Sequence, residues 1–105
     1  MGTKKQQFKE LRRIFREQVF ERDNHCCKFC DEKENLDAHH ITNRHKMPCD
    51  GYVLTNGITL CQKHHIMAEM YATGDIFSFS PEKLYEKINS SYEKALEDCK
   101  KLEKI

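Results

Sequence analysis

The hydrophobic positions near the start of the chain repeat at steps of three and four residues. Phe8, Leu11, Phe15 and Val19 form this stripe, and residues 5–21 contain neither glycine nor proline. Steps of three and four return to the same face of a helix, so the pattern predicts an amphipathic helix over about residues 5–21.

A second stripe of the same period runs through the last quarter of the chain. Ser80 and Pro81 are suited to a helix N-cap and to the first helical position. The spacing predicts one helix over about residues 81–103, whose stripe either closes over the first helix or docks on a partner. The stripe consists of Leu84, Ile88, Tyr92, Ala95, Cys99 and Leu102.

The middle of the chain is expected to hold two short strands and a helix. Residues 36–42 are expected to form the first strand and residues 43–51 a polar loop. Residues 52–54 and 57–60 are expected to form a short returning segment on either side of Asn56, and a helix is expected over about residues 61–72. His39 and His40 are adjacent in the first strand. Their rings should therefore point to opposite faces unless the strand bends or bulges there.

Length and composition limit the class of protein. A chain of 105 residues with 38% hydrophobic content is expected to form a single domain, residues 1–105, with a modest core. The sequence has no run of about 18 apolar residues and no apolar segment behind its polar N-terminus, so we expect a cytoplasmic protein with no membrane partner. In a reducing compartment, six cysteines indicate metal ligands or free thiols.

Four metal-ligating residues occur as two pairs, each with two intervening residues. Cys27 and Cys30 form one pair, and Cys61 and His64 form the other. This spacing is typical of a zinc knuckle, and a Cys3His set fills all four positions of a tetrahedral ion. The sequence therefore predicts a structural Zn²⁺ ion. The remaining cysteines, which have no partner at ligand spacing, are expected to be packing or incidental thiols: Cys26, Cys49 and Cys99.

Positive charge is gathered near the N-terminus. Residues 1–22 hold seven basic and three acidic side chains, although the whole chain has a net charge of only +1. A basic helix suits contact with nucleic-acid phosphates, and an ordinary solvated helix face would have the same pattern. The side chains predicted to contact nucleic acid are Lys9, Arg12, Arg13 and Arg16.

A second cluster of chemically active residues surrounds two histidine pairs. His65 and Glu69 are one helical turn apart, so they lie on the same face of the expected helix. His39 and His40 come from the strand, and Asn56 lies between the two pairs. These residues predict a second, catalytic site for a divalent metal.

The order of these motifs resembles that of a known family. Cys-x2-Cys, Ala-His-His-Ile and Asn-Gly-Ile-Thr-Leu-Cys-x2-His-His follow one another as in the zinc-containing HNH endonucleases of phages and mobile elements. The resemblance covers roughly residues 16–70. It implies a ββα-metal (His-Me) finger over about residues 24–73. The expected fold class is therefore α+β, with this core and its zinc knuckle flanked by N-terminal and C-terminal amphipathic helices.

The resemblance also implies roles for individual residues. His40 would be the general base, His39 and His65 ligands of the catalytic metal, and Asn56 the residue that orients the base and braces the loop. Glu69 is a further candidate ligand. The chain departs from many family members in having His39 in place of aspartate and His64 in place of a fourth zinc cysteine. The expected catalytic ion is Mg²⁺, Mn²⁺, Ni²⁺, Co²⁺ or Zn²⁺.

We therefore expect a metal-dependent HNH endonuclease that hydrolyses DNA phosphodiester bonds by nicking, with weak sequence specificity. DNA is the expected partner, and a homodimer or a larger phage protein is a candidate for the C-terminal helix. One alternative is a non-catalytic zinc-stabilised module that binds DNA or protein. Another is a small regulatory protein that docks on a larger machine and keeps residual nuclease chemistry.

Overall fold

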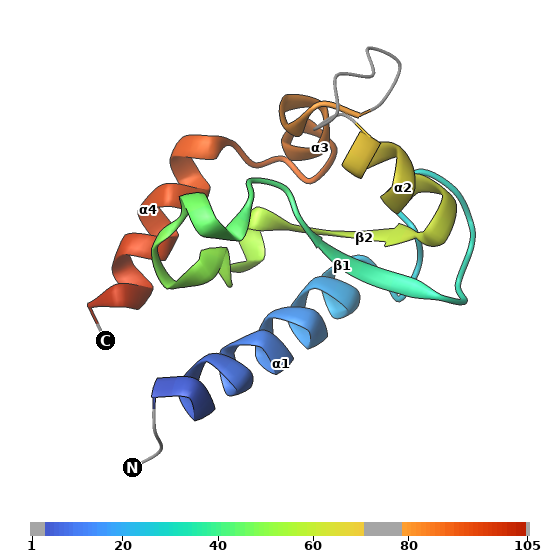
Figure 1. Ribbon diagram of the computed structural model, residues 1–105. Coiled ribbons are helices and arrows are strands. Elements are labelled where there is room, and N and C mark those ends of the chain that lie inside the picture. The colour runs from blue at the N-terminus through green and yellow to red at the C-terminus, as the bar shows by residue number, and fades with distance from the viewer. Residues whose placement is uncertain (1–3, 71–78, 105) are drawn as a thin grey trace.

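The described residues form a small α+β fold in which four α-helices surround one antiparallel β-hairpin (Figure 1). The computed structural model describes residues 4–70 and 79–104, with side chains from residue 9 onward. The elements in chain order are α1 (Lys4–Arg22), β1 (Leu36–His40), the 3-10 helices η1 (Arg44–Lys46), η2 (Pro48–Gly51) and η3 (Leu54–Asn56), β2 (Gly57–Cys61), α2 (Gln62–Met70), α3 (Pro81–Lys87) and α4 (Tyr92–Glu103).

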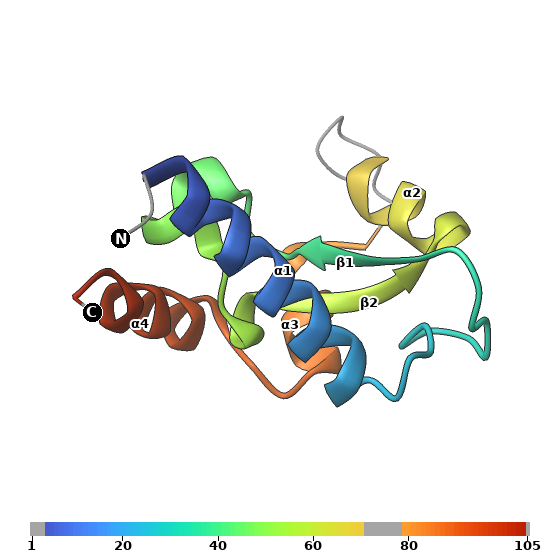
Figure 2. The same cartoon turned by 90° about the horizontal axis from the view of Figure 1, so that it is seen from below.

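The hairpin lies between α1 and α2, as the two views in Figures 1 and 2 show. Its strands pair in an unbroken register from Leu36 opposite Cys61 to His40 opposite Gly57. Side chains alternate between the faces of a regular strand. One face of β1 is therefore available to α1 and the other to α2, and both helices contact this strand.

Strand β2 is the centre of the core, because all five of its residues are buried. Ile58 and Leu60 join the main hydrophobic cluster, whereas Phe15 and Val19 of α1 form a second cluster with Tyr52. Gly57 permits the close approach of α1. A Cβ atom at this position would lie 2.5 Å from a Val19 side-chain carbon and 2.6 Å from the Phe15 ring.

The end of α1 is attached to β2 by a charged pair whose role the sequence did not reveal. Asp23 is buried, pairs with Arg22, and accepts a hydrogen bond of 2.9 Å from the backbone N–H of Thr59. The Arg22 guanidinium also donates to the carbonyl oxygens of Leu54 and Gly57, at 2.9 and 2.7 Å. The pair is thus satisfied on all sides, as a buried charge must be.

The C-terminal segment forms two helices, so the prediction of one helix over residues 81–103 was wrong. Asn89 has a left-handed φ of 55°, which ends α3, and the Ser91 side chain caps the start of α4 by accepting from the Lys94 N–H at 3.1 Å. Between them, Ser90 donates a hydrogen bond to the carbonyl oxygen of Thr55. Asparagine and serine compete with helix continuation through such local contacts, which outweighed the apolar period.

Much of the C-terminal stripe is used inside the chain. Leu84, Ala95 and Cys99 are buried in the main cluster, while Tyr92 remains 45% exposed. Helix α4 rests chiefly on η2 and η3. The stripe thus completes the core of this chain, and it does so against the loop between the strands.

The remaining element predictions agree with the structure to within a few residues. Helix α1 confirms the helix expected over residues 5–21, and β1 ends two residues earlier than expected. Helix α2 begins one residue later than expected, and the final residues of that helix and of the expected core, 71–73, lie outside the described part. No helix within the described ranges is long and apolar enough to cross a membrane.

Candidate metal centres and the adjoining hollow

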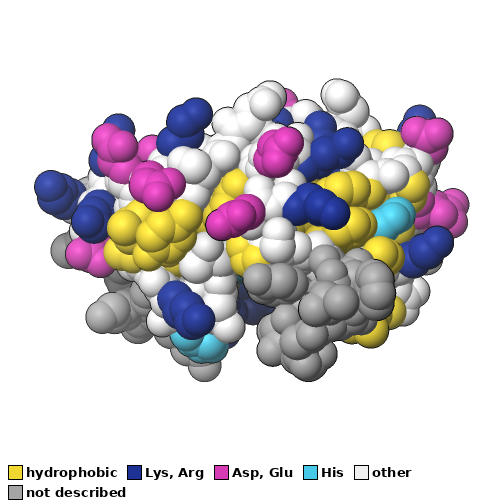
Figure 3. Space-filling view, turned by 90° about the horizontal axis from the view of Figure 1, so that it is seen from above, with side chains coloured by type: hydrophobic (Ala, Val, Ile, Leu, Met, Phe, Trp, Pro, Cys, Tyr) yellow, Lys and Arg dark blue, Asp and Glu magenta, His cyan; other side chains and the backbone are white. Residues whose placement is uncertain are grey.

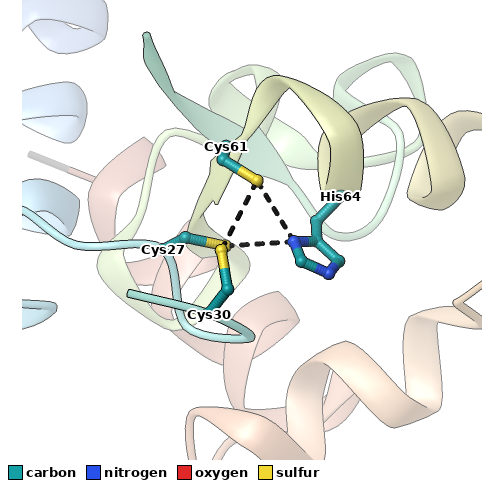
Figure 4. A group of neighbouring side chains, drawn as sticks. All are labelled: Cys27, Cys30, Cys61 and His64. Carbon is teal, nitrogen blue, oxygen red and sulfur yellow. Dashed lines mark hydrogen bonds between the residues drawn. The ribbon is translucent and has the colours of Figure 1, made fainter. Parts of the chain in front are cut away.

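The first candidate metal centre unites three cysteines and one histidine from separate segments (Figure 4). Cys27 and Cys30 lie on the loop after α1, Cys61 ends β2, and His64 is in the first turn of α2. The Sγ atoms of Cys30 and Cys61 are 3.7 Å apart. The His64 Nδ1 atom lies 3.5 Å from the Cys27 Sγ and 3.1 Å from the Cys61 Sγ.

These separations fit a tetrahedral zinc ion. With Zn–S bonds of about 2.3 Å and a Zn–N bond of about 2.0 Å, a regular tetrahedron places sulfurs about 3.8 Å apart and sulfur and nitrogen about 3.5 Å apart. Each of the four residues offers one ligand atom to the same point. The group could therefore hold one structural zinc, as the paired spacing predicted.

The surroundings of the cysteines act on their ionisation in opposite directions. The backbone N–H of Phe29 points at the Cys27 Sγ at 3.5 Å. A hydrogen bond from the backbone of Glu32 lowers the pKa of Cys30, but burial and the neighbouring thiols outweigh it and raise that pKa to about 11. Burial opposes ionisation of Cys61, but the backbone N–H groups of His64 and Lys63 and the neighbouring thiols lower its pKa on balance. Cys26 turns its Sγ toward the carbonyl oxygens of Cys27 and Cys30 and does not join the group. Cys49 and Cys99 lie elsewhere, and Cys99 is buried in the core.

The second candidate centre consists of His39, His65 and Glu69. Their ligand atoms all lie within 4.8 Å of one another, and the His65 Nε2 atom is 3.1 Å from a Glu69 carboxylate oxygen. His39 reaches this group because its position on β1 turns it toward α2. Burial, aided by His65 and His40, lowers the pKa of His39 to about 4. The ring is therefore neutral at pH 7, which is the form that binds a metal.

One residue that lies beside this centre was not identified from the sequence. Asp37 lies two positions before His39 on the same face of β1, and its Oδ2 atom is 3.1 Å from the His65 Nδ1 atom. A carboxylate on the second ring nitrogen of a ligand histidine fixes the tautomer that leaves the first nitrogen free. The i,i+2 alternation of a strand was the signal that could have found it.

His40 points to the other face of β1, as regular alternation requires, because the strand has no bulge there. Its ring stacks on Phe15 of α1 at a centroid distance of 4.5 Å and lies 5.0 Å from the Tyr52 ring. Its Nε2 atom is buried and has no hydrogen-bond partner among the described residues. Burial and the positive charge of Arg44 lower the pKa of His40 to about 4, so this ring is also neutral at pH 7.

Asn56 braces the loop that follows β1. It is fully buried, and its side-chain Nδ2 donates to the carbonyl oxygens of Thr42 and Gly51, both at 3.2 Å. Its Oδ1 accepts from the Thr42 N–H at 2.9 Å and from the Tyr85 hydroxyl at 2.7 Å. These four contacts hold residues on both sides of the left-handed turn at Cys49–Gly51. None of them is made to His40.

A broad surface hollow of about 930 Å³ joins the second centre to His40. Part of its wall is basic, and the residues that supply this charge only partly match those predicted. Arg12 and Arg16 of α1 line the hollow, whereas Lys9 and Arg13 do not. Arg13 pairs instead with Glu10 and Glu17 on the outer face of the helix. The other basic lining residues come from η1: Arg44, His45 and Lys46.

Comparisons of the chain with protein-family models, with curated proteins and with solved structures found no match. The family resemblance therefore depends on the ordered motifs alone. The geometry that bears on it is the Cys3His group and the two-stranded hairpin followed by α2.

Proposed function

We propose that this chain is a metal-dependent endonuclease of the HNH type that hydrolyses phosphodiester bonds of DNA. One observation carries the proposal. The same hollow is lined by the candidate metal ligands His39, His65 and Glu69, by the neutral ring of His40 and by arginine side chains. These are the components that hydrolysis of a phosphate diester requires: a metal site, a base and positive charge.

The metal site has the chemistry of a catalytic centre. His39, His65 and Glu69 supply three protein ligands, which leaves coordination positions for water and phosphate, in contrast to the closed Cys3His group. A divalent ion bound there supplies electrostatic stabilisation of the phosphate and of the leaving oxygen. Imidazole ligands suit Mn²⁺, Ni²⁺, Co²⁺ or Zn²⁺, and Mg²⁺ remains a candidate through the carboxylate.

His40 is assigned the role of general base. Its Nε2 atom is buried and has no hydrogen-bond partner among the described residues, so no described protein group competes with the attacking water for it. The stacked ring of Phe15 limits the orientations of the imidazole. A pKa of about 4 makes a weak base in the free protein. The negative charge of a bound phosphate would raise that pKa toward the working pH, where general bases are most effective.

The Cys3His group acts as scaffold in this proposal. It joins the loop after α1 to the end of β2 and the start of α2. An ion bound there would fix α2 on the hairpin, and thereby fix His65 relative to His39. Structural zinc contributes roughly 10–16 kcal/mol in small peptides, which is comparable to the stability of a whole domain.

Cleavage of supercoiled plasmid, with and without added Mg²⁺ or Mn²⁺, tests the proposal. A single ββα unit attacks one phosphate at a time, so open circular DNA should appear first and linear DNA late. His40→Phe should abolish cleavage, because phenylalanine keeps the ring packing on Phe15 but has no nitrogen. His25→Asn is a matched control. His25 lies outside the hollow, and asparagine tolerates its left-handed φ of 53°.

The alternative of a non-catalytic zinc-stabilised binding module retains one observation in its favour. The Cys3His group is complete without any contribution from the hollow. A folded, zinc-loaded protein that binds DNA but does not nick plasmid with any of the five candidate metals would establish this alternative and refute the nuclease.

A further inference from the structure

The turn η1 presents three consecutive ionisable side chains at the edge of the hollow. Arg44, His45 and Lys46 are all exposed, and all three line the hollow. Neither Arg44 nor Lys46 lies within ion-pair distance of a carboxylate in the described part of the chain. Neighbouring cations without counter-charges attract an anionic ligand.

The backbone of η1 is held in place at its base. The Asn43 side chain caps the turn by accepting from the His45 N–H at 2.8 Å. The residue before it, Thr42, is bound on both its N–H and its carbonyl oxygen by Asn56. Because β1 ends at His40, the same short segment fixes η1 relative to that ring. The cations therefore stand on an anchored turn, which reduces the ordering cost of binding.

Arg44 is connected to the surroundings of His40. Its Nη1 atom donates a hydrogen bond of 3.3 Å to the Tyr52 hydroxyl, and the Tyr52 ring lies 5.0 Å from the His40 ring. The charge of Arg44 lowers the His40 pKa, after burial, while Asp50 and Asp37 act in the opposite direction. Neither carboxylate forms an ion pair with Arg44. The guanidinium is therefore both close to the proposed base and free to bind an anion.

The basic side chains of α1 divide between the hollow and the outer face of the helix. On α1, Arg12 lines the hollow without an ion pair in the described residues, Arg16 lies 3.8 Å from Asp37, and Arg13 is paired on the outer face. The face over α3 and α4 mixes basic and acidic side chains with apolar patches (Figure 3). Cations without partners thus converge on the hollow from two elements, α1 and η1.

We propose that η1 is a phosphate-binding subsite of the nuclease hollow, in which Arg44 and Lys46 bind DNA backbone phosphates next to the phosphate at His40. Arg12 of α1 holds the backbone from a second element. This inference rests on the proposed function, because it takes DNA as the ligand. The sequence predicted phosphate contacts only on the N-terminal helix, at Lys9, Arg12, Arg13 and Arg16. The proposed subsite adds contacts on a turn that follows the histidine pair.

Salt dependence of DNA binding measures the number of phosphates contacted. A labelled 20-base-pair duplex is titrated with zinc-loaded protein by fluorescence anisotropy between 50 and 200 mM KCl, with no added divalent ion. Each phosphate contact contributes about −0.9 to the slope of log K against log salt. The double variant Arg44→Gln/Lys46→Gln should therefore have a slope less steep by about 1.8, and its Kd at 100 mM KCl should be higher than that of the wild type.

Two further variants keep the test decisive. Lys46→Gln alone, which disturbs no hydrogen bond or ion pair in the described structure, should reduce the slope by about 0.9. Arg13→Gln removes one positive charge from α1 outside the hollow and should leave the slope unchanged. Circular dichroism and zinc content should match the wild type in all three.

The outcomes separate this inference from the proposed function. A double variant with the slope of the wild type, beside an Arg12→Gln variant that loses slope, would overturn the η1 subsite and leave DNA binding intact. An Arg13→Gln variant that loses as much slope per charge as Lys46→Gln would overturn it too, because binding would then follow net charge alone. A wild type that does not bind DNA would refute both.

Discussion

The Nδ1 atom of His65 lies 3.1 Å from the Asp37 carboxylate, and the Nε2 atom of the same ring lies 3.1 Å from Glu69. The ring thus lies between acidic side chains from different elements. A histidine that donates its Nδ1 proton to a carboxylate presents the Nε2 lone pair to a metal and is a stronger ligand for it. Asp37 is therefore a positioning residue for the second candidate centre.

Replacing Asp37 with asparagine should weaken binding of a divalent ion at the second centre by about 10- to 100-fold, as loss of such partners does elsewhere. Isothermal titration of the zinc-loaded protein with Mn²⁺ measures the affinity. The ¹⁵N chemical shifts of His65, recorded without added metal, should show a smaller share of the Nδ1–H tautomer in the variant. Glu34→Gln, a carboxylate change outside the hollow, is the control. Unchanged Mn²⁺ affinity and tautomer in Asp37→Asn would show that the pair has no such role.

Two cysteines of the loop after α1 offer a matched pair of variants that tests the zinc group. Cys30 belongs to the group, whereas Cys26 does not. Metal analysis of the purified wild type should give about one zinc per chain. Cys30→Ser should lose zinc and unfold, because three ligands bind far less tightly than four and the free energy of folding is linked to metal binding. Cys26→Ser should keep both zinc and fold. A folded Cys30→Ser protein without zinc would contradict the structural role.

The sequence was most informative where spacing and chemistry coincide. The two-residue spacers marked Cys27 with Cys30 and Cys61 with His64 as ligand pairs, and the i,i+4 relation brought Glu69 to His65. These relations are local and survive in any fold that forms the expected loop and helix, whereas the union of the two pairs in one group was inferred from their ligand chemistry. The helix at the N-terminus was predicted from its local period, whereas the α+β class was expected from the family resemblance.

Contacts between distant segments could not be predicted in this way. The stack of His40 on Phe15, the bonds from Asn56 to Thr42 and Tyr85, and the convergence of α1 and η1 depend on how the elements pack. Periodicity also misled where local hydrogen bonding competes with it, as in the break between α3 and α4. For the expected phosphate contacts, the helical pattern alone could not show that Arg12 lines the hollow and that Arg13 does not.

Asn56 should be essential for the loop between the strands. Asn56→Ala would remove the partner of the Thr42 N–H, the Thr42 carbonyl and the Gly51 carbonyl, at a cost of about 1–3 kcal/mol for each group left unsatisfied, while the Tyr85 hydroxyl keeps its contact with Thr42 Oγ1. Tyr85→Phe removes only the hydroxyl, so its loss of unfolding free energy should be about 1 kcal/mol. Chemical denaturation of both variants beside the wild type measures the difference. Equal losses would show that Asn56 does not brace the loop as its contacts indicate.

The neutral histidines should make the fold sensitive to acid. The pKa of His40 falls from 6.5 to about 4 on folding, so below pH 6.5 the unfolded chain binds a proton that the folded chain does not. The stabilisation is present above pH 6.5 and is lost as the pH falls toward 4, and His39 acts in the same direction. After allowance for partial exposure and screening, His40 should contribute about 1–2 kcal/mol to the unfolding free energy that is lost.

Protonation of the zinc thiolates also destabilises the fold at low pH, so the experiment must cancel that contribution. Urea unfolding of zinc-saturated wild type and His40→Phe at pH 7 and pH 5 does this, because both keep the same Cys3His group. The variant should lose less unfolding free energy than the wild type between the two pH values. Equal losses would mean that His40 takes up its proton in the folded protein as readily as in the unfolded chain.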